Sequence, residues 1–191
     1  MTETPVTLPP MDLDSITPLT LRDFTQGKIK ETDPRSELLI RGAVASVRRH
    51  CGWHVSPARE ESFILDGRGG RIQRLPTLHV ADVLTVTDGG QELTYRNDYR
   101  WSEMGLLERM HGSWSQHFRD VEVTAVHGHD DVPDIVAMIL SVIARTMASP
   151  MGATREQAGA MSVTWATTSP GVAGGMVLLQ SELAMLSSFR L

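Results

Sequence analysis

The chain has 191 residues, enough for one domain with a sizeable hydrophobic core and too few for two comfortable ones. Hydrophobic residues make up 41% of it and charged residues 21%, which excludes wholesale disorder, and the single cysteine excludes a disulfide framework or a multi-thiolate zinc site. The formal net charge of −5 is unlike that of a general DNA-binding protein, which is expected to be basic.

Residues 1–32 are predicted to form an N-terminal arm. Residues 1–18 contain four of the ten prolines and little apolar periodicity, which is typical of a segment that stays extended until a partner binds it. The stretch TPLTLRDFTQGKI is compatible with a short helix. The first residues lack the basic start and apolar run of a signal peptide, so we expect the protein to remain in the cytoplasm in which it is made. No apolar run reaches the roughly 20 residues of a membrane span, so no membrane partner is expected.

The stretch DPRSELLIRGAVASVRRHCGW predicts a helix. Asp33 can cap its start, Pro34 suits the first helical position, and Gly52 ends it. The apolar residues fall on one face, and Arg41 and Arg48 lie largely off that face.

After this helix the apolar period changes to two, which is typical of strands. The segments SFILD, RIQRL, HVADVLTVT, ELTY, NDYRW, GLLERM and DVEVTAV predict one antiparallel sheet of roughly five or six strands. DGRGG at 66–70 and TDGGQ at 87–91 are hairpin signals, because Asp-Gly tolerates the positive φ angles of tight turns. Val80, Leu84 and Val86 are predicted to share one face of their strand.

The stretch PDIVAMILSVIARTMASPMG predicts a second helix, from Pro133 to Ser149, that is apolar nearly all round. Such a helix must be covered on nearly all sides, and a small sheet can cover only one. Neighbouring copies are the natural candidates for the remaining sides, so we expect a homo-oligomer. Further along, MSVTWA predicts one strand, a Gly-rich loop follows through Gly175, and MVLLQSELAMLSSFRL predicts a terminal amphipathic helix.

The junction VHGHDDVPDIV carries the clearest candidate for metal chemistry. His127 and His129 alternate along a strand and could join Asp131 as ligands of zinc or another divalent metal in a small hydrolase. Gly128 and the following Asp-Asp-x-Pro indicate instead that the strand ends and a helix begins, with Asp131 and Asp134 as a capping pair. The second interpretation accounts for more of the residues, so we predict no metal and no cofactor.

A thiol nucleophile is the second catalytic candidate. Cys51 has His50 and His54 beside it, and a neighbouring base can activate a thiol. A cysteine at a helix end is more often a small buried apolar group, and the sequence has no GxSxG, no HExxH and no second cysteine. We therefore predict that the protein is not an enzyme.

Charge is distributed unevenly along the chain. Residues 35–74 hold eight arginines and four acids, a balance of 8 − 4 = +4, and residues 75–134 hold four arginines and eleven acids, a balance of 4 − 11 = −7. This asymmetry favours docking between complementary surfaces, including those of identical copies. A nucleic-acid-binding accessory protein is the alternative, and it requires strongly salt-dependent affinity for DNA.

The order of these motifs resembles that of the head–tail connector, or adaptor, proteins of long-tailed bacteriophages. The resemblance runs from about Asp33 to the C-terminus, through Cys-Gly-Trp, SPAREESFILDGRGG, LPTLHVADVLTVTDGG, NDYRW, VTAVHGHDDVPDIV, the apolar helix and ASPMGATREQAG. Its specificity lies in the series as a whole, above all in the strand-end HG, the Pro-capped apolar helix and SPMG. The family commonly has a tyrosine where this chain has His129, which weakens the metal interpretation.

The resemblance implies an α+β fold of ring-forming helices with a small antiparallel sheet and extended N- and C-terminal arms. It implies a twelve-fold ring adaptor in the virion neck, below the portal protein of the head and above a stopper or tail-completion protein. Duplex DNA would pass through the ring without sequence-specific binding, and assembly would take place in the host cytoplasm. The family has no catalytic residues to transfer.

Carried onto this sequence, the resemblance divides the chain into the arm 1–32, a connector core 33–150 and a portal-facing C-terminal arm 151–191. The helices of the core supply the ring-interface candidates, which are Ile135, Met138, Ile139, Val142, Arg41 and Arg48. The end of the C-terminal arm supplies the portal-docking candidates, which are Ser188, Phe189, Arg190 and Leu191.

Overall fold

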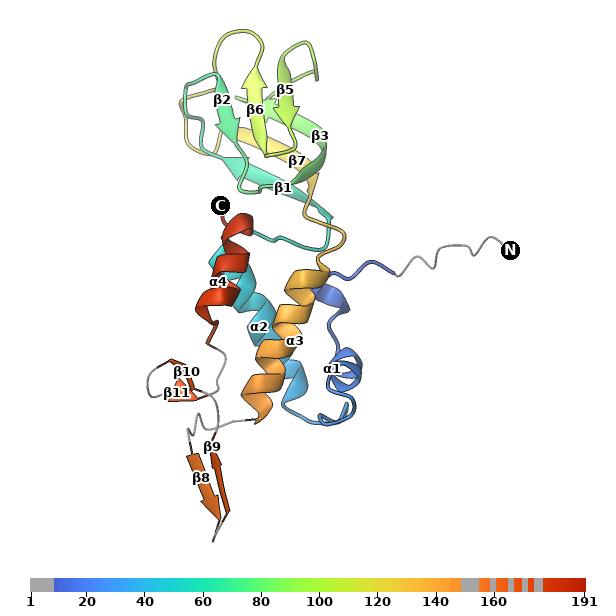
Figure 1. The fold of residues 1–191 in the computed structure, drawn as a ribbon. Coiled ribbons are helices and arrows are strands. Elements are labelled where there is room, and N and C mark those ends of the chain that lie inside the picture. Colours follow the sequence, from blue (N-terminus) through green and yellow to red (C-terminus); the bar gives the residue numbers. More distant parts are fainter. Residues whose placement is uncertain (1–8, 149–154, 159–160, 165–166, 170–171, 174–176) are drawn as a thin grey trace, which may run out of the picture. The chain divides into compact units, whose positions relative to one another are not determined.

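The computed structural model describes residues 9–148, 155–158, 161–164, 167–169, 172–173 and 177–191, and side chains within 9–148 and 177–191. Its contacts divide the chain into two compact units. Unit 1 comprises Met1–Val47 and Asp131–Ser188, and unit 2 comprises Arg48–Asp130 and Phe189–Leu191. Unit 1 is mainly helical and unit 2 is a β structure, so the α+β prediction is confirmed (Figure 1). These units do not follow the three predicted segments, which stay predictions.

The helices, in chain order, are η1 (Leu13–Ser15), α1 (Pro18–Phe24), α2 (Ser36–Cys51), α3 (Pro133–Ala148), α4 (Gln180–Leu186) and η2 (Ser187–Phe189). The short helix predicted before residue 32 is thus present as α1. Thr17 caps it through the Thr20 N–H, and Leu13, Ile16 and Leu21 are buried. Residues 11–17 are therefore folded as well, whereas the sequence predicted that residues 1–18 stay extended until a partner binds.

The ends of α2 follow the local sequence signals. Its first residue is Ser36, two positions later than the Pro34 start predicted, because residues 34–35 form a turn in which Asp33 Oδ1 accepts the Arg35 N–H at 2.9 Å. At the other end Gly52 has φ +83°, and its N–H donates to the Arg48 carbonyl oxygen at 2.9 Å. A left-handed residue at this position is favoured by glycine, so Gly52 ends the helix as predicted.

The apolar helix α3 is covered within the single chain. Its buried residues are Ile135, Val136, Met138, Ile139, Leu140, Val142, Ile143 and Met147. In Figure 1, α1, α2, α3 and α4 gather in one bundle, and Arg145 of α3 forms an ion pair with Glu182 of α4 at 2.9 Å. The premise that neighbouring copies must cover this helix is therefore wrong. The prediction considered only the sheet as cover, whereas helices from both ends of the sequence supply it.

Unit 2 contains two antiparallel sheets where the sequence predicted one. The four-stranded sheet has the order β1 (Arg59–Leu65), β7 (Val121–His127), β3 (Val80–Asp88), β4 (Gln91–Glu92). The three-stranded sheet has the order β2 (Ile72–Arg74), β6 (Leu106–Arg109), β5 (Tyr99–Ser102). Figure 1 shows them as two layers, and the core of this unit includes Phe63, Leu75, Val86, Leu107, Trp114, Val121 and Val123.

The two hairpin signals have different outcomes. Gly89 and Gly90 both have positive φ and connect the paired strands β3 and β4, so the hairpin at 87–91 is confirmed. The segment 66–70 instead leads from one sheet to the other, because β1 pairs with β7 and β2 pairs with β6. It lies against residues 114–117, where Gly67 donates to the His117 carbonyl oxygen at 2.9 Å. A Cβ on Gly67 would lie 2.2 Å from the Ser115 carbonyl oxygen, so this close approach requires glycine.

Irregular pairing in β3 changes which of its side chains are buried. The register of β3 against β7 shifts between Val80 and Asp82 and again between Val83 and Thr85. As a result Val80, Val83 and Val86 are buried, and Leu84 is 46% exposed. The prediction that Leu84 shares the buried face is wrong, because each extra residue reverses the alternation of the side chains.

The C-terminal segment contains more strands than predicted. β8 (Arg155–Ala158) pairs with β9 (Met161–Thr164), and β10 (Thr167–Ser169) pairs with β11 (Val172–Ala173). Only the strand beginning at Met161 was predicted, and Trp165, Ala166 and Gly175 lie outside the described residues. The predicted terminal helix is shorter, as α4 and η2. Over the described residues, none of the helices combines the length and hydropathy needed to cross a membrane.

Candidate functional site

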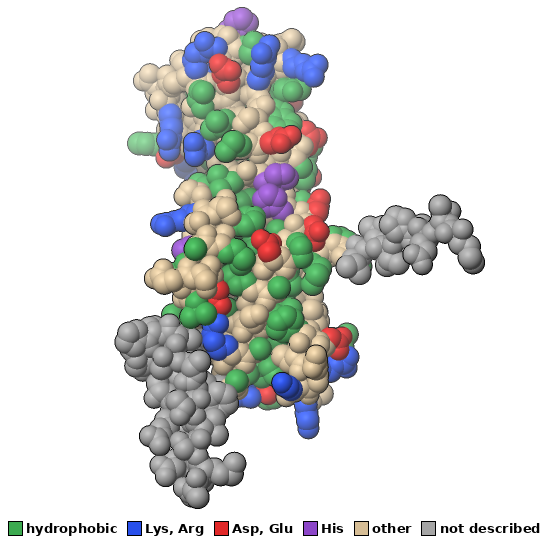
Figure 2. All heavy atoms as spheres, viewed as in Figure 1, with side chains coloured by type: hydrophobic (Ala, Val, Ile, Leu, Met, Phe, Trp, Pro, Cys, Tyr) green, Lys and Arg blue, Asp and Glu red, His purple; other side chains and the backbone are tan. Residues whose placement is uncertain are grey.

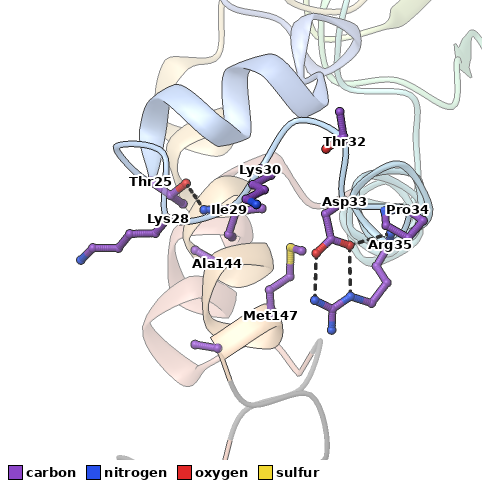
Figure 3. A pocket seen from close by; sticks show the side chains of 11 residues that line it. Thr25, Lys28, Ile29, Lys30, Thr32, Asp33, Pro34, Arg35, Ala144 and Met147 are labelled. Carbon is purple, nitrogen blue, oxygen red and sulfur yellow. Dashed lines mark hydrogen bonds and ion pairs between the residues drawn. The ribbon is translucent and has the colours of Figure 1, made fainter.

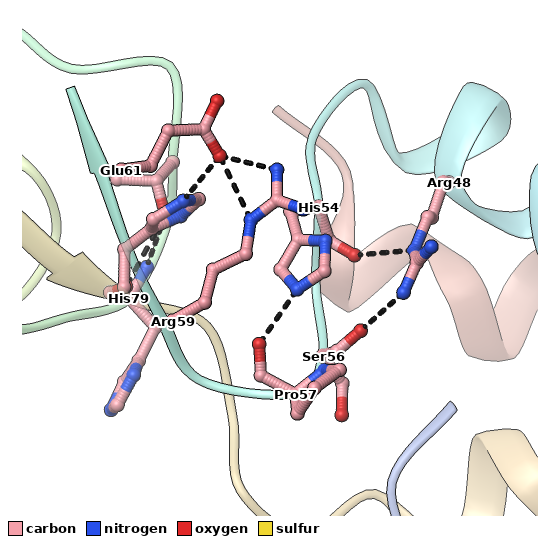
Figure 4. A network of polar contacts seen from close by, with 9 residues as sticks. Arg48, His54, Ser56, Pro57, Arg59, Glu61 and His79 are labelled. Atoms are coloured by element: carbon pink, nitrogen blue, oxygen red, sulfur yellow. Dashed lines mark hydrogen bonds and ion pairs between the residues drawn. The ribbon is translucent and has the colours of Figure 1, made fainter. Parts of the chain in front are cut away.

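The last residue of β7, His127, belongs to a polar network in unit 2. Its partner Glu61 and the neighbouring Arg59 are labelled in Figure 4. The side chain of His127 is buried, its Nε2 lies 3.1 Å from Glu61 Oε2, and its Nδ1 lies 3.2 Å from Thr77 Oγ1. Glu61 also accepts hydrogen bonds from the guanidinium of Arg59. Burial lowers the pKa of His127, although the Glu61 carboxylate acts in the opposite direction. Burial acts to raise the pKa of Glu61, but Arg59 and His127 hold it below its ordinary value.

The loop that follows α2 is held to the helix by Arg48. Its Nε donates to the His54 carbonyl oxygen at 3.2 Å, and its Nη2 donates to the Ser56 carbonyl oxygen at 2.7 Å. The Nε2 of His54 lies 2.7 Å from the Pro57 carbonyl oxygen. Burial lowers the pKa of His54, as do the nearby charges of Arg48 and Arg59. Arg48, predicted as a ring-interface residue, thus positions this loop within one chain.

Cys51 is not arranged as a nucleophile. The residue is fully buried, and burial raises the pKa of its thiol to about 11. Its thiol is therefore protonated at neutral pH, and the nearby His54 ring is hydrogen-bonded to Pro57. The Cys51, His50 and His54 combination considered from the sequence lacks the thiolate that such chemistry needs.

The three residues considered from the sequence as possible metal ligands have separate partners. His127 binds Glu61 and Thr77, and the His129 ring stacks on that of His79 with centroids 4.3 Å apart. Asp131 belongs to unit 1, where its Oδ1 accepts the Met11 N–H at 2.8 Å. Across the described part of the chain, no group of three or more His, Cys, Asp or Glu side chains is placed to hold a metal ion.

The end of the chain lies on unit 2, in an arrangement that the sequence did not reveal. The indole Nε1–H of Trp53 donates to the Phe189 carbonyl oxygen at 2.6 Å, and the Leu191 N–H donates to the Cys51 carbonyl oxygen at 2.9 Å. The Phe189 ring meets His129 edge to face, with centroids 5.7 Å apart. We call Cys51, Gly52, Trp53 and His129 the C-terminal seat. The only sequence signal was the Cys-Gly-Trp motif at a helix end, which gives no information on its partner.

The predicted portal-docking residues are therefore engaged within the chain. Phe189 and Leu191 lie in the C-terminal seat, and Arg190 between them is exposed. Ser188 is also exposed, and its Oγ donates to the Met185 carbonyl oxygen at 3.0 Å. Their docking to a portal protein stays a prediction.

The ring-interface candidates differ in accessibility. Ile135, Met138, Ile139 and Val142 are buried in the single chain, and Arg48 is half-buried. Of the six candidates, Arg41 alone is exposed, in the structure as described. The assignment of these residues to an interface between copies stays a prediction. Because most of them are buried, exposed positions of the same helices are better placed to contact another copy.

A cavity of about 550 Å³ in unit 1 lies between the loop that precedes α2 and the end of α3 (Figure 3). Lys28 and Lys30 lie at its edge, and Ile29, Ala144 and Met147 supply apolar lining. Asp33 is paired with Arg35 at 2.9 Å, and hydrogen bonds from Arg35 lower the pKa of its carboxyl to about 2. The combination of lysines with an apolar lining suits an acidic segment that also carries apolar side chains.

The fold is shared with proteins of known location. The chain matches one from the neck of an empty gene transfer agent (GTA) particle, computed with C6 symmetry, at 17% identity and a TM-score of 0.56. It also matches one from the neck of a native GTA particle, computed with C12 symmetry, at 16% identity and a TM-score of 0.57. Each match covers 100% of this chain and 95% of the other. No protein-family model matches the sequence. No curated protein sequence matches it either.

Proposed function

We propose that the chain is a structural protein of a phage-like virion neck, where its copies form a ring adaptor between the portal vertex of the head and a stopper or tail protein. The observation that carries the proposal is the fold shared, over the full length of the chain, with proteins from the necks of GTA particles. One of those necks was computed with C12 symmetry, which favours the twelve-fold ring that the motif order implies. A ring closes when one surface of each copy contacts a different surface of the next.

The contacts within unit 2 support a structural role. Two of the groups that first suggested chemistry have structural roles: His127 is part of a buried network with Glu61 and Thr77, and Cys51 is part of the core. Such a network fixes the loop between α2 and β1 and the end of β7. Residues of the C-terminal seat lie in or next to these two segments, so the network also holds the seat in place. The side chains thus act by holding the fold and its docking surfaces in place.

The exposed face of α3 is the stronger candidate for contact between copies. Asp134, Ala137, Ser141 and Ala148 are exposed at helical spacing, and the small side chains among them permit close approach of a neighbouring helix. Met138 and Met185 line a groove between α3 and α4 on the same side. We propose that a helix of the next copy packs here, with Arg41 elsewhere on the surface as a partner for acidic residues.

DNA would pass through the ring without tight binding. The net charge is −5, and on the face shown in Figure 2 the basic side chains are interspersed with acidic and apolar ones. A duplex-binding surface would require lysines and arginines gathered into a continuous area.

Native mass spectrometry tests this function on the protein alone and after incubation with portal-bearing heads. We expect rings of about twelve copies in at least one of the two samples, since assembly on the portal can template the ring. A chain that stays monomeric in both samples and does not join the heads would contradict the proposal. A stoichiometric metal ion in the mass would favour a metal-dependent hydrolase instead.

A further inference from the structure

The last three residues of the chain are packed with a different unit from the helix that precedes them. The segment Asp131–Ser188 belongs to unit 1, whereas Phe189–Leu191 belong to unit 2. Most of the contacts that hold this tripeptide involve its backbone. The Phe189 carbonyl oxygen accepts from Trp53, and the Leu191 N–H donates to Cys51. Backbone contacts of this kind are those by which proteins bind short peptides.

The last residue of the tail is incompletely covered and lies beside a second cavity of unit 2. Leu191 remains 45% exposed and borders a cavity of about 240 Å³. Gln73 also lines this cavity, and its side chain is buried, with Nε2 donating to the Asp66 carbonyl oxygen at 3.1 Å. The Gln73 Oε1 atom has no hydrogen-bond partner among the described residues. A buried acceptor without a donor is unfavourable, so this cavity beside Leu191, although the seat residues do not line it, has a polar group that the tail leaves unsatisfied.

We propose that the C-terminal seat is a peptide-binding site and that Phe189–Leu191 is its exchangeable ligand, held in the free subunit and released when the C-terminus docks on a partner in the assembled neck. Peptide binding by the C-terminal seat is a property of this chain alone and does not depend on the proposed function. The release step rests on the proposed function, because it requires a partner that binds the C-terminus.

The small number of contacts makes exchange feasible. A tail with two backbone hydrogen bonds and one ring contact binds weakly as a separate molecule. It stays bound in the intact chain because attachment gives it an effective concentration on the order of millimolar. A partner surface that offers the tail more contacts can therefore displace it without unfolding the seat.

The first experiment measures peptide binding in trans. The chain is truncated after Ser188 and labelled with 15N, and the indole N–H resonance of Trp53 is followed while the peptide Ser-Ser-Phe-Arg-Leu is added. We expect truncation to shift the Trp53 resonance and the peptide to return it, saturably, with an affinity on the order of millimolar. A peptide of the same composition in scrambled order is the control and should leave the resonance unmoved.

The indole of Trp114 reports whether the truncated chain remains folded. It is buried and donates to the Arg71 carbonyl oxygen at 3.0 Å, so its resonance should not change on truncation. If truncation shifts the Trp114 resonance, the full-length variants Phe189→Ala and Arg190→Ala are used in place of the truncated chain. Phe189→Ala should accelerate solvent exchange of the Trp53 indole proton several-fold, and Arg190→Ala, at an exposed position, should not. The proposal that the seat binds this peptide would be overturned in either of two cases. In the first, the Trp53 signal of a folded truncated chain does not respond to the peptide. In the second, the Trp53 signal of the full-length chain does not respond to Phe189→Ala.

The second experiment tests release. Trp53→Phe removes the hydrogen bond to the tail and keeps the tail itself, so the variant should bind portal-bearing heads more tightly, by up to about tenfold. Unchanged or weaker binding would overturn the release step. If neither the unchanged chain nor the Trp53→Phe variant binds heads, while the peptide still binds the truncated chain, the proposed function fails and the peptide-binding site stands.

Discussion

The indole nitrogen of Trp53 donates a hydrogen bond at 2.6 Å to the carbonyl oxygen of Phe189, 136 positions later in the sequence. The contact brings the second residue after the end of α2 together with the third-last residue of the chain. It also explains why Phe189–Leu191 form part of unit 2. The C-terminus is thus a structured element of this protein in its isolated form.

Gly67 should be intolerant of any side chain. A Cβ at this position would lie 2.2 Å from the Ser115 carbonyl oxygen, so Gly67→Ala forces two backbone segments apart. We expect the free energy of unfolding, measured in urea, to fall by about 1–3 kcal/mol. Gly70→Ala is the matched control, because the nearest atom to its Cβ would be 4.0 Å away. Equal effects at the two glycines would contradict the close approach of residues 66–70 to residues 114–117.

The irregular register of β3 can be tested at adjacent positions. Val83 is 9% exposed and Leu84 is 46% exposed, although simple alternation with Val80 and Val86 would bury Leu84. Val83→Ala should lower the free energy of unfolding by about 1–3 kcal/mol, and Leu84→Ala should change it by less than about 0.5 kcal/mol. A larger loss of unfolding free energy for Leu84→Ala than for Val83→Ala would contradict the irregular register and support the regular alternation predicted from the sequence.

Stability should decrease on mild acidification because of His127. Burial places its folded-state pKa below the ordinary value of 6.5, so the unfolded chain binds more protons as the pH falls. The stability is fully present above pH 6.5 and is lost as the pH falls toward the folded-state pKa, by at most about 1.4 kcal/mol per pH unit. Urea unfolding between about pH 8 and pH 5 measures the slope. His127→Gln should reduce it, and His117→Gln, in an exposed loop, should leave it unchanged.

Cys51 should be protected from thiol reagents in the folded chain. Burial raises the pKa of its thiol from 9.0 to about 11, so the reactive thiolate is rare at neutral pH and is inaccessible. We expect modification by an aromatic disulfide reagent at a rate set by unfolding. Because the folded state favours the protonated thiol, its contribution to stability is present below pH 9 and is lost as the pH rises toward 11. Rapid modification at neutral pH without urea would refute this description.

Local signals in the sequence predicted several element ends correctly. Gly52 ends α2, Pro133 begins α3, and the Asp88–Gly90 turn connects β3 to β4, because each depends on backbone preferences of adjacent residues. The register of β3 could not be predicted in this way. Its register shifts exist only in the pairing with β7, a strand that lies more than 30 residues further along the sequence.

Long-range contacts account for the other differences. The burial of α3 depends on helices at both ends of the chain, and the contact between Met11 and Asp131 is one of the bonds that place the N-terminal segment. His127, proposed from the sequence as a possible metal ligand, gains its partners Glu61 and Thr77 only when three distant segments meet. Sequence periodicity predicts which side chains need cover, but it does not identify the elements that supply the cover.

The most direct test of the neck assignment is electron cryomicroscopy of portal-bearing heads after incubation with the purified chain. We expect added density at a single vertex of each head, with about twelve copies arranged as a ring around the DNA channel. Heads whose portal vertex is unchanged by the chain, or chains bound over the whole head surface, would contradict the neck assignment.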